Sequence, residues 1–566
     1  MAGRLNARTH TVLIGAASCG WLLTMAFASA AGLQRPVAEG GAAPAPSTAI
    51  SRTAFDVSDN CMACHNGLTT SAGEDISIGA NWRATMMANS ARDPYWQAAV
   101  RREVMDHPAA ADEIEDECAT CHMPMARTQA MWNGSKGEVF AHLPVGAADT
   151  QEAKLAADGV SCTMCHRITA DRFGTPASFT GGFVVSADVT PGKASVFGPY
   201  PVDAGRTTIM HSATGFVPAE SQHIRQSEMC ATCHTLYTKA RGPNGEVIGE
   251  FPEQVPYLEW RHSAFREERS CQSCHMPVVT EPVRFSSVLG ELREGVARHS
   301  FRGGNFFMLR MLNRYRTELG VEALPQELEA SVRDTIEHLR TETATLAIDR
   351  AEHSGGRLVV DVSVQNLSGH KLPTAYPSRR AWLHVVVKDR SGAVVFESGA
   401  VTREGLIHGN DNDADPTRAE PHYTEITSPS AVQIYESIMV DPAGAITTGL
   451  LKATGYVKDN RLLPRGFDKA TAAKDIAVHG AAATDNDFTA GGDRVRYVIA
   501  TTAAQGPFTV DVELNFQPIA YRWAQNLKPY DAVETRRFVS YFESMASGST
   551  AVLAKARASV TSRDRE

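Results

Sequence analysis

The sequence lacks several features that mark common classes of protein. Its 566 residues have a formal net charge of −9, so no basic excess points to nucleic acid as a partner. With 44 Gly, 28 Pro and 43% hydrophobic residues, the chain is neither collagen-like nor of low complexity, and it is not a multi-span membrane protein. Its 11 cysteines are few, and odd in number, for a disulfide scaffold of this length. The composition is that of a globular chain with several domains.

The N-terminus is typical of an exported protein. Two arginines precede an apolar stretch over residues 12–27, and the small residues 28–30 form a cleavage pattern. Residues 1–30 are therefore predicted to be a signal peptide, and the Ala-, Pro- and Gly-rich residues 31–54 a flexible linker. The alternatives are a permanent membrane anchor, for which the apolar run is short, and a lipid anchor on Cys19. We expect the mature protein in the periplasm or at the cell surface.

Ten of the cysteines fall into five Cys-x-x-Cys-His motifs. This pattern is the signature of covalent c-type haem attachment, in which both thiols form thioethers and the histidine binds iron on the proximal side. Structural zinc would need further paired ligands, and a redox Cys-x-x-Cys would not recur five times with His after it. The motifs, each with its proximal histidine, are Cys61–Cys64–His65, Cys118–Cys121–His122, Cys162–Cys165–His166, Cys230–Cys233–His234 and Cys271–Cys274–His275.

The motifs carry a family resemblance. Residues 55–310 resemble the multihaem cytochrome c family, and the Cys-His-Met-Pro runs ending at Pro124 and Pro277 are similar to modules of tetrahaem electron carriers. This resemblance implies tightly stacked haems joined by helix and coil, with electron transfer as the expected role. The spacing between the motifs is irregular, so the chain has no fixed repeat.

The sixth iron position decides whether a haem is an electron relay or a binding site. Histidines beside glycine or proline, or shortly before a motif, are the favoured distal ligands. These are His211, His223, His262, His299 and His370. Met86, Met87, His107 and His142 are weaker candidates, and core packing is the alternative for the two methionines. His338 falls off the apolar stripe of its predicted helix and is expected in solvent, and His384 is expected within a strand.

The second half of the chain changes to a period of two. Alternating apolar residues, as in 357–364 and 508–514, predict an antiparallel, immunoglobulin-like β-sandwich. The fold class is therefore α+β and multidomain. The predicted organisation is a pentahaem domain over 55–320, a bridging helix over 321–346, the sandwich over 347–530 and a helical segment over 531–566.

An acidic loop follows within this half. Asp411, Asp413 and Asp415 alternate and offer oxygen ligands for calcium, although Pro416 and His422 stand where an EF-hand needs Gly and Glu. A solvated acidic loop is the alternative.

Three functions are compatible with these features. The first is an exported electron carrier with mostly bis-histidine haems, whose partners are redox proteins such as other multihaem cytochromes or a quinol-linked membrane complex. The second is an oxidoreductase that acts on a small nitrogen or sulfur species at one open haem. The third is a surface binding module stiffened by haems. The histidine count permits five closed irons without requiring them.

Overall fold

The structure is a computed structural model that describes residues 54–188 and 193–561. The predicted signal peptide and all but the last residue of the predicted linker lie outside these residues. Within the described part, no helix is long and apolar enough to cross a membrane.

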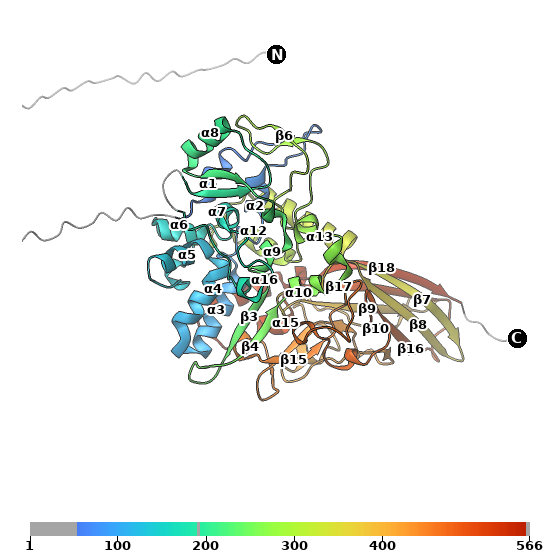
Figure 1. The fold of residues 1–566 in the computed structure, drawn as a ribbon. Coiled ribbons are helices and arrows are strands. Elements are labelled where there is room, and N and C mark those ends of the chain that lie inside the picture. Colours follow the sequence, from blue (N-terminus) through green and yellow to red (C-terminus); the bar gives the residue numbers. More distant parts are fainter. Residues whose placement is uncertain (1–53, 189–192, 562–566) are drawn as a thin grey trace, which may run out of the picture. The chain divides into compact units, whose positions relative to one another are not determined.

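The first half of the described chain consists of short helices and loops, drawn in blue to green in Figure 1. Asp93 caps α3 by accepting hydrogen bonds from the backbone N–H groups of Tyr95 and Trp96, and Pro94 takes the first helical position. The helices of this half are α1 (Ser58–Met62), α2 (Ile78–Arg83), α3 (Pro94–Asp106), α4 (Ala111–His122), α5 (Pro124–Trp132), α6 (Gln151–Ala157), α7 (Cys162–Arg167), α8 (Ala204–Thr214), α9 (Ser227–Ala231), α10 (Pro256–Arg261), α11 (Cys271–His275) and α12 (Phe306–Arg314).

Three small two-stranded sheets accompany these helices. The strands are β1 (Ser195–Gly198) with β2 (Val217–Glu220), β3 (Leu236–Arg241) with β4 (Val247–Gln254), and β5 (Val283–Arg284) with β6 (Leu292–Arg293). Short 3₁₀ turns add η1 (Pro108–Ala110), η2 (Phe140–His142), η3 (Pro176–Ser178), η4 (Gln222–Arg225) and η5 (Ala264–Glu267) here, and η6 (Leu450–Lys452), η7 (Lys474–Ile476), η8 (Ala481–Ala483) and η9 (Ala546–Gly548) in the second half.

The bridging helix predicted over 321–346 is present as α13 (Pro325–Glu342). Beyond it two larger sheets follow, drawn in yellow to red in Figure 1. One has the order β10 (Val394–Ser398), β9 (Arg380–Lys388), β17 (Phe508–Gln517), β18 (Ala551–Val560), with β12 (Ile434–Tyr435) also on β9. The other has the order β11 (Glu425–Ile426), β16 (Gly492–Ala500), β8 (Arg357–Asn366), β7 (Ala344–Ser354). A third sheet has the order β14 (Ile446–Thr447), β13 (Ser437–Val440), β15 (Gly455–Asp459).

The two larger sheets share one buried cluster. Alternate residues of β8, such as Val360 and Val362, are fully buried, and so are Val510 and Leu514 of β17. This period of two explains why the sequence predicts strands here. All pairings in these two sheets are antiparallel except that of β11 with β16. The fold is α+β, and a hairpin turn at Asp389–Gly392 joins β9 to β10.

The prediction of a wholly helical segment over 531–566 is wrong. Its described part, residues 531–561, contains one α-helix, α16 (Val533–Met545), and then strand β18, which pairs with β17 along its length. The alternation in β18 is small against charged, as in Ala554–Lys555–Ala556–Arg557, so it gives a weak strand signal. The remaining helices are α14 (Asp411–Ala414) and α15 (Tyr521–Gln525).

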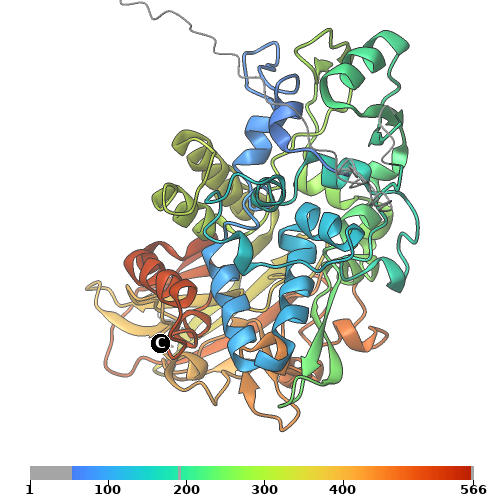
Figure 2. The ribbon, with the colours of Figure 1, turned by 90° about the vertical axis from the view of Figure 1, so that its left-hand side faces the viewer.

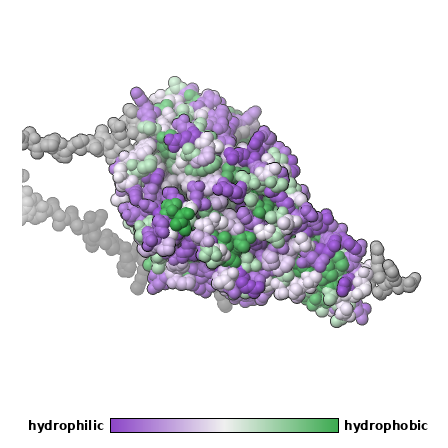
Figure 3. Space-filling view, turned by 60° about the horizontal axis from the view of Figure 1, so that its bottom comes forward, coloured by the Kyte–Doolittle hydropathy of each residue, from purple (hydrophilic) through white to green (hydrophobic). Residues whose placement is uncertain are grey.

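The C-terminal helix packs against the N-terminal half. Figure 2 shows α16, in red, beside α3, in blue, and the rings of Tyr95 and Phe538 meet at 5.0 Å. Segments more than 400 residues apart in the chain therefore share the same core. On the face drawn in Figure 3, hydrophobic residues lie in small separate groups among polar ones, which is ordinary for a protein surface.

Candidate functional site

All five Cys-x-x-Cys-His motifs face one continuous cavity of about 940 Å³ in the helical half. In each motif the chain makes a helical turn: the backbone N–H of His65, for example, donates to the carbonyl of Cys61. This turn brings the two thiols of a motif to one side, with the histidine beside them. Each of the five motif histidines lines the cavity. The ten motif cysteines form no disulfide.

Most histidines that line the cavity are in a protonation state or tautomer that suits metal binding. Burial lowers the pKa of His122, His275 and His299 to about 4, so these rings are neutral at pH 7. Nδ1 of His65 donates to the carbonyl of Phe285 at 2.6 Å, and that of His122 donates to the carbonyl of Ser90 at 3.0 Å. A ring that donates from Nδ1 keeps the lone pair of Nε2 free for iron. His166, His275, His299 and His370 make the same kind of bond to backbone carbonyls.

Two of the five predicted distal histidines lie opposite proximal ones. The ring centroids of His166 and His299 are 6.4 Å apart, and those of His275 and His370 are 6.2 Å apart. With metal–nitrogen bonds of about 2 Å and ring centres about 1.2 Å beyond each nitrogen, two imidazoles on one metal are separated by about 6.4 Å. The first separation fits an iron between His166 and His299, whereas His275 has two rings at such a distance, those of His370 and His338, and only one of them can share its iron. The loop glycines near each histidine, such as Gly303 and Gly369, also line the cavity.

The structure corrects the expectation that His338 lies in solvent. His338 is 8% exposed and lines the cavity, and its ring centroid lies 6.3 Å from that of His275. The apolar stripe of α13 packs on the hydrophobic core, whereas His338 turns toward the cavity. Because the cavity is a second buried surface, the position of His338 off the stripe reflects a side chain turned to the cavity and not to solvent.

Three predicted distal ligands are not presented to the cavity. His223 is buried, but its Nε2 donates to the carbonyl of Ile168 at 2.8 Å and its Nδ1 pairs with the Ser221 hydroxyl at 2.6 Å. The Nε2 of His262 donates to the carbonyl of Asp468 at 3.0 Å. His211 is half-buried on α8 outside the cavity wall, although its neighbour Met210 lines the wall. The first two rings have no free Nε2 lone pair, so the structure does not support them as ligands.

The weaker candidates divide in the same way. Met86 and Met87 line the cavity, which leaves both ligation and packing open to them. His107 is buried at the end of α3, and His142 is half-buried in η2; neither lines the cavity. Proximity to a motif in the sequence therefore did not bring these two rings to the site.

Polar atoms in the cavity wall also fit haem. The buried Ser300 hydroxyl and the Nε of Arg302 have no hydrogen-bond partner among the described residues, and both residues line the cavity. Unpartnered buried donors are costly unless a bound group accepts from them. Haem propionates are acceptors of this kind, so the donors, the thiols and the neutral imidazoles together fit c-type haem.

The motifs are neighbours in space in an order that differs from the sequence. The Cys61 thiol is within hydrogen-bonding reach of Cys162, which places motif one beside motif three. Motif four is the centre of the set. Its two thiols lie within the same reach of the other motifs, Cys233 of Cys121 in motif two and Cys230 of Cys271 in motif five. Cys165 of motif three is within electrostatic range of Cys233.

The predicted calcium ligands are not gathered into a site. Asp413 is fully buried and forms a bidentate ion pair with Arg380, at 2.8 and 2.9 Å. Asp411 pairs with Arg418, and Asp415 accepts hydrogen bonds from Thr417. Because these side chains have separate protein partners, the calcium prediction is not supported.

A different cluster, His422 with Asp485 and Asp493, has donor atoms close enough for a metal. The Nδ1 of His422 accepts from the side-chain amides of Gln433 at 2.8 Å and Asn460 at 3.1 Å. Nε2 must then carry the proton that it donates to Asp485 at 2.9 Å. Both ring nitrogens of His422 are therefore engaged within the protein, although Oδ1 of Asp493 has no hydrogen-bond partner among the described residues.

Comparisons with known proteins agree with this geometry. No family model matches the sequence, and no curated protein sequence matches it. The structure is similar to the crystal structure of a penta-heme cytochrome c552 from Thermochromatium tepidum, with a TM-score of 0.51 and 17% identity. The match covers 90% of this chain and 99% of the other. The chain has a multihaem-cytochrome-like fold.

Proposed function

We propose that the protein is an exported pentahaem c-type cytochrome that transfers electrons through its haems. The observation that carries this proposal is the single cavity into which all five motifs open. Haems attached there would be in contact with one another, because thiols of neighbouring motifs lie within hydrogen-bonding reach. Closely placed redox centres favour electron transfer over isolated binding sites.

The proposed path runs from motif one to motif three and then to motif four. Motifs two and five both adjoin motif four, so the relay branches there. The proximal histidines repeat this pattern: His122 and His275 are each within electrostatic range of His234, and His166 is within range of His65. Electrons entering at one end would have two exits, or two inputs would meet at motif four.

We assign three distal ligands. His299 completes motif three, because it stands 6.4 Å from His166. His338 completes motif five, since its partner Glu342 lies within electrostatic range of Cys274 in that motif. His275 can share its iron with only one of the two rings that lie 6.2 and 6.3 Å away, so His370 is left for motif four, where Arg379 is within electrostatic range of both His370 and His234.

The second half of the chain has a positioning role in this proposal. Its two larger sheets form a β-sandwich in this proposal. The loop after β8 brings His370 to the cavity. Redox proteins, such as other multihaem cytochromes or a quinol-linked membrane complex, are the proposed partners. The periplasm or cell surface is the proposed location, because residues 1–30 are predicted to be a signal peptide.

The test uses the purified holoprotein. We expect five haems per chain by mass and by haem quantification, and a stepwise, reversible redox titration of all of them. His299→Ala is expected to convert one low-spin ferric haem to high spin, whereas His384→Ala, on the exposed side of β9, leaves the spectrum unchanged. Fewer than five covalent haems, or haems that exchange electrons only with added mediators and not with each other, would refute the proposal.

A further inference from the structure

Only three histidines besides the proximal five line the cavity in the described part of the chain. They are His299, His338 and His370. The assignments above use them for motifs three, five and four. Motifs one and two are then left without a second histidine.

The surroundings of these two motifs differ. Beside motif one, α8 places the thioether of Met210 in the cavity wall, together with the rings of Tyr200 and Phe285. Methionine is a haem ligand in its own right. Motif two instead faces ionisable side chains from three separate elements.

Those side chains are Tyr95 and Glu103 of α3, Glu253 of β4, and Tyr376 of the loop before β9. All four line the cavity. Both glutamates are within electrostatic range of Cys118, and Glu253 is also within range of Cys121. The hydroxyls of Tyr95 and Tyr376 are 3.4 Å apart, and the ring of Trp96 stacks on that of His122 at 4.4 Å.

The two carboxylates are deeply buried but held in place. Glu253 accepts from the Thr238 hydroxyl at 2.5 Å, and Glu103 accepts from the backbone N–H of Leu450 at 2.8 Å. Burial raises the pKa of Glu253 to about 7 and also raises that of Glu103. Glu103 has the Arg102 guanidinium within electrostatic range, which offsets part of its burial. Buried carboxyl groups are expensive to keep in a fold, and they collect at functional sites.

We propose that motif two has no sixth protein ligand, and that Tyr95, Tyr376, Glu103 and Glu253 form the wall of a binding site at its open side. The ligand is a small uncharged molecule with a nitrogen or oxygen donor atom. An anion is disfavoured whenever Glu253 is ionised, because its charge then faces the site. The tyrosine hydroxyls and a protonated Glu253 are hydrogen-bond donors for the bound molecule. This inference rests on the proposed function, since it requires haem at motif two.

The first measurement is the spin state of the purified ferric holoprotein. We expect a high-spin signal from about one haem in five, and nitric oxide should bind at that haem alone. The inference would be overturned if all five haems are low-spin and bind no nitric oxide. It would also be overturned by a far-red charge-transfer band that shows methionine on the iron of motif two. A reversible redox titration of all five haems would still support electron transfer in that case.

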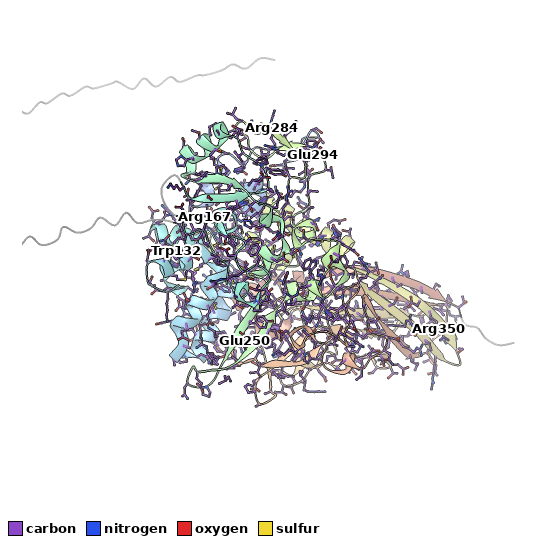
Figure 4. All side chains as sticks on the ribbon, viewed as in Figure 1. Trp132, Arg167, Glu250, Arg284, Glu294 and Arg350 are labelled. Atoms are coloured by element: carbon purple, nitrogen blue, oxygen red, sulfur yellow. The ribbon has the colours of Figure 1, made fainter. Side chains whose placement is uncertain are left out.

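The second measurement places the open iron beside Glu253. Azide serves as an anionic probe at pH 8, where Glu253 is mostly ionised. Glu253→Gln removes the charge without changing the shape, and we expect it to raise azide affinity at least fivefold while nitric oxide binding changes by less than twofold. Glu250→Gln is the matched control on the same strand; Figure 4 labels Glu250, which is exposed.

A second variant, at Tyr376, tests the same site in case Glu253→Gln does not fold. Tyr376→Phe removes one hydroxyl and is expected to speed nitric oxide dissociation at least threefold. If azide affinity is unchanged in Glu253→Gln and nitric oxide dissociation is unchanged in Tyr376→Phe, the open iron lies elsewhere and the assignment to motif two is wrong. If only Glu253→Gln fails to fold, Tyr376→Phe still decides the question.

Discussion

Replacing Asp459 with Asn should destabilise the protein and disturb a haem at the same time. Asp459 ends β15 and lies at the centre of a buried cluster of four charges. It accepts from the Nζ of Lys371 at 2.7 Å and from Nε and Nη2 of Arg461 at 2.8 and 2.7 Å. Arg461 also pairs with Glu259 of α10 at 2.9 Å. None of these side chains is more than 8% exposed.

The magnitude follows from the charge balance. Two cations and two carboxylates cancel in the native cluster, whereas Asp459→Asn leaves Lys371 and Arg461 facing Glu259 alone. Breaking a buried ion pair from one side costs about 3–5 kcal/mol. The control is Asp511→Asn, which removes the same charge from a half-exposed pair with Arg557 and should cost less than about 1 kcal/mol.

The cluster also predicts an acid limb of stability. Burial by itself would raise the pKa of Asp459, but Arg461 and Lys371 outweigh it and hold that pKa well below the usual range. A carboxyl with a lowered pKa stabilises the fold above its unfolded value of about 4, and this contribution is lost as the pH falls below that value. Asp459→Asn should therefore flatten the acid limb as well as lower stability at pH 7.

The assay is guanidinium unfolding of the holoprotein followed by circular dichroism, together with the ferric spectrum. Lys371 follows His370 in the chain and its backbone N–H donates to Glu259 at 3.1 Å, so the cluster positions His370. We expect a high-spin fraction to appear in Asp459→Asn and not in Asp511→Asn. Equal unfolding midpoints for the two variants would refute the reasoning, because a solvated cluster would lose no more than the surface pair.

Three further predictions concern other parts of the chain. His338→Ala should convert one low-spin haem to high spin, and an unchanged electron paramagnetic resonance spectrum would exclude His338 as a ligand. Asp413→Ala leaves the buried Arg380 without its carboxylate and should lower the free energy of unfolding by about 3–5 kcal/mol. A calcium chelator should leave the unfolding midpoint of the wild type unchanged; a shift with chelator would support a calcium site after all. Gly399→Ala should cost more than Gly392→Ala in thermal unfolding, because a Cβ at residue 399 meets the Leu383 carbonyl while one at 392 meets open space, and equal losses would contradict this.

Much of the fold could be predicted from local pattern. Asp93–Pro94 marks the start of α3, the alternation of 357–364 marks β8, and Asp389–Gly392 marks a hairpin turn, since each depends on neighbouring residues only. The last strand, β18, escaped prediction because its inward residues are mostly alanines. Its identity as a strand depends on pairing with β17, which no local pattern encodes.

The distal ligands could be predicted only in part. His299 and His370 stand in glycine-flanked loops, and such loops allow a histidine to approach a flat ring closely. His223 and His262 were favoured because each shortly precedes a motif, yet their Nε2 atoms donate to the backbone carbonyls of Ile168 and Asp468. These hydrogen-bond partners are 55 and 206 residues away in the chain, so the local sequence could not predict the contacts.

The sequence alone determined the chemistry that this chain supports. Five Cys-x-x-Cys-His motifs need only residues within one helical turn, so the expectation of five haems and five proximal ligands requires no tertiary information. The tertiary structure decided the rest: which histidines turn Nε2 toward the cavity, the meeting of motifs two, three and five at motif four, and the carboxyl groups beside motif two. These features join residues that are distant in the chain, and only packing of the helical half against the sheets brings them together.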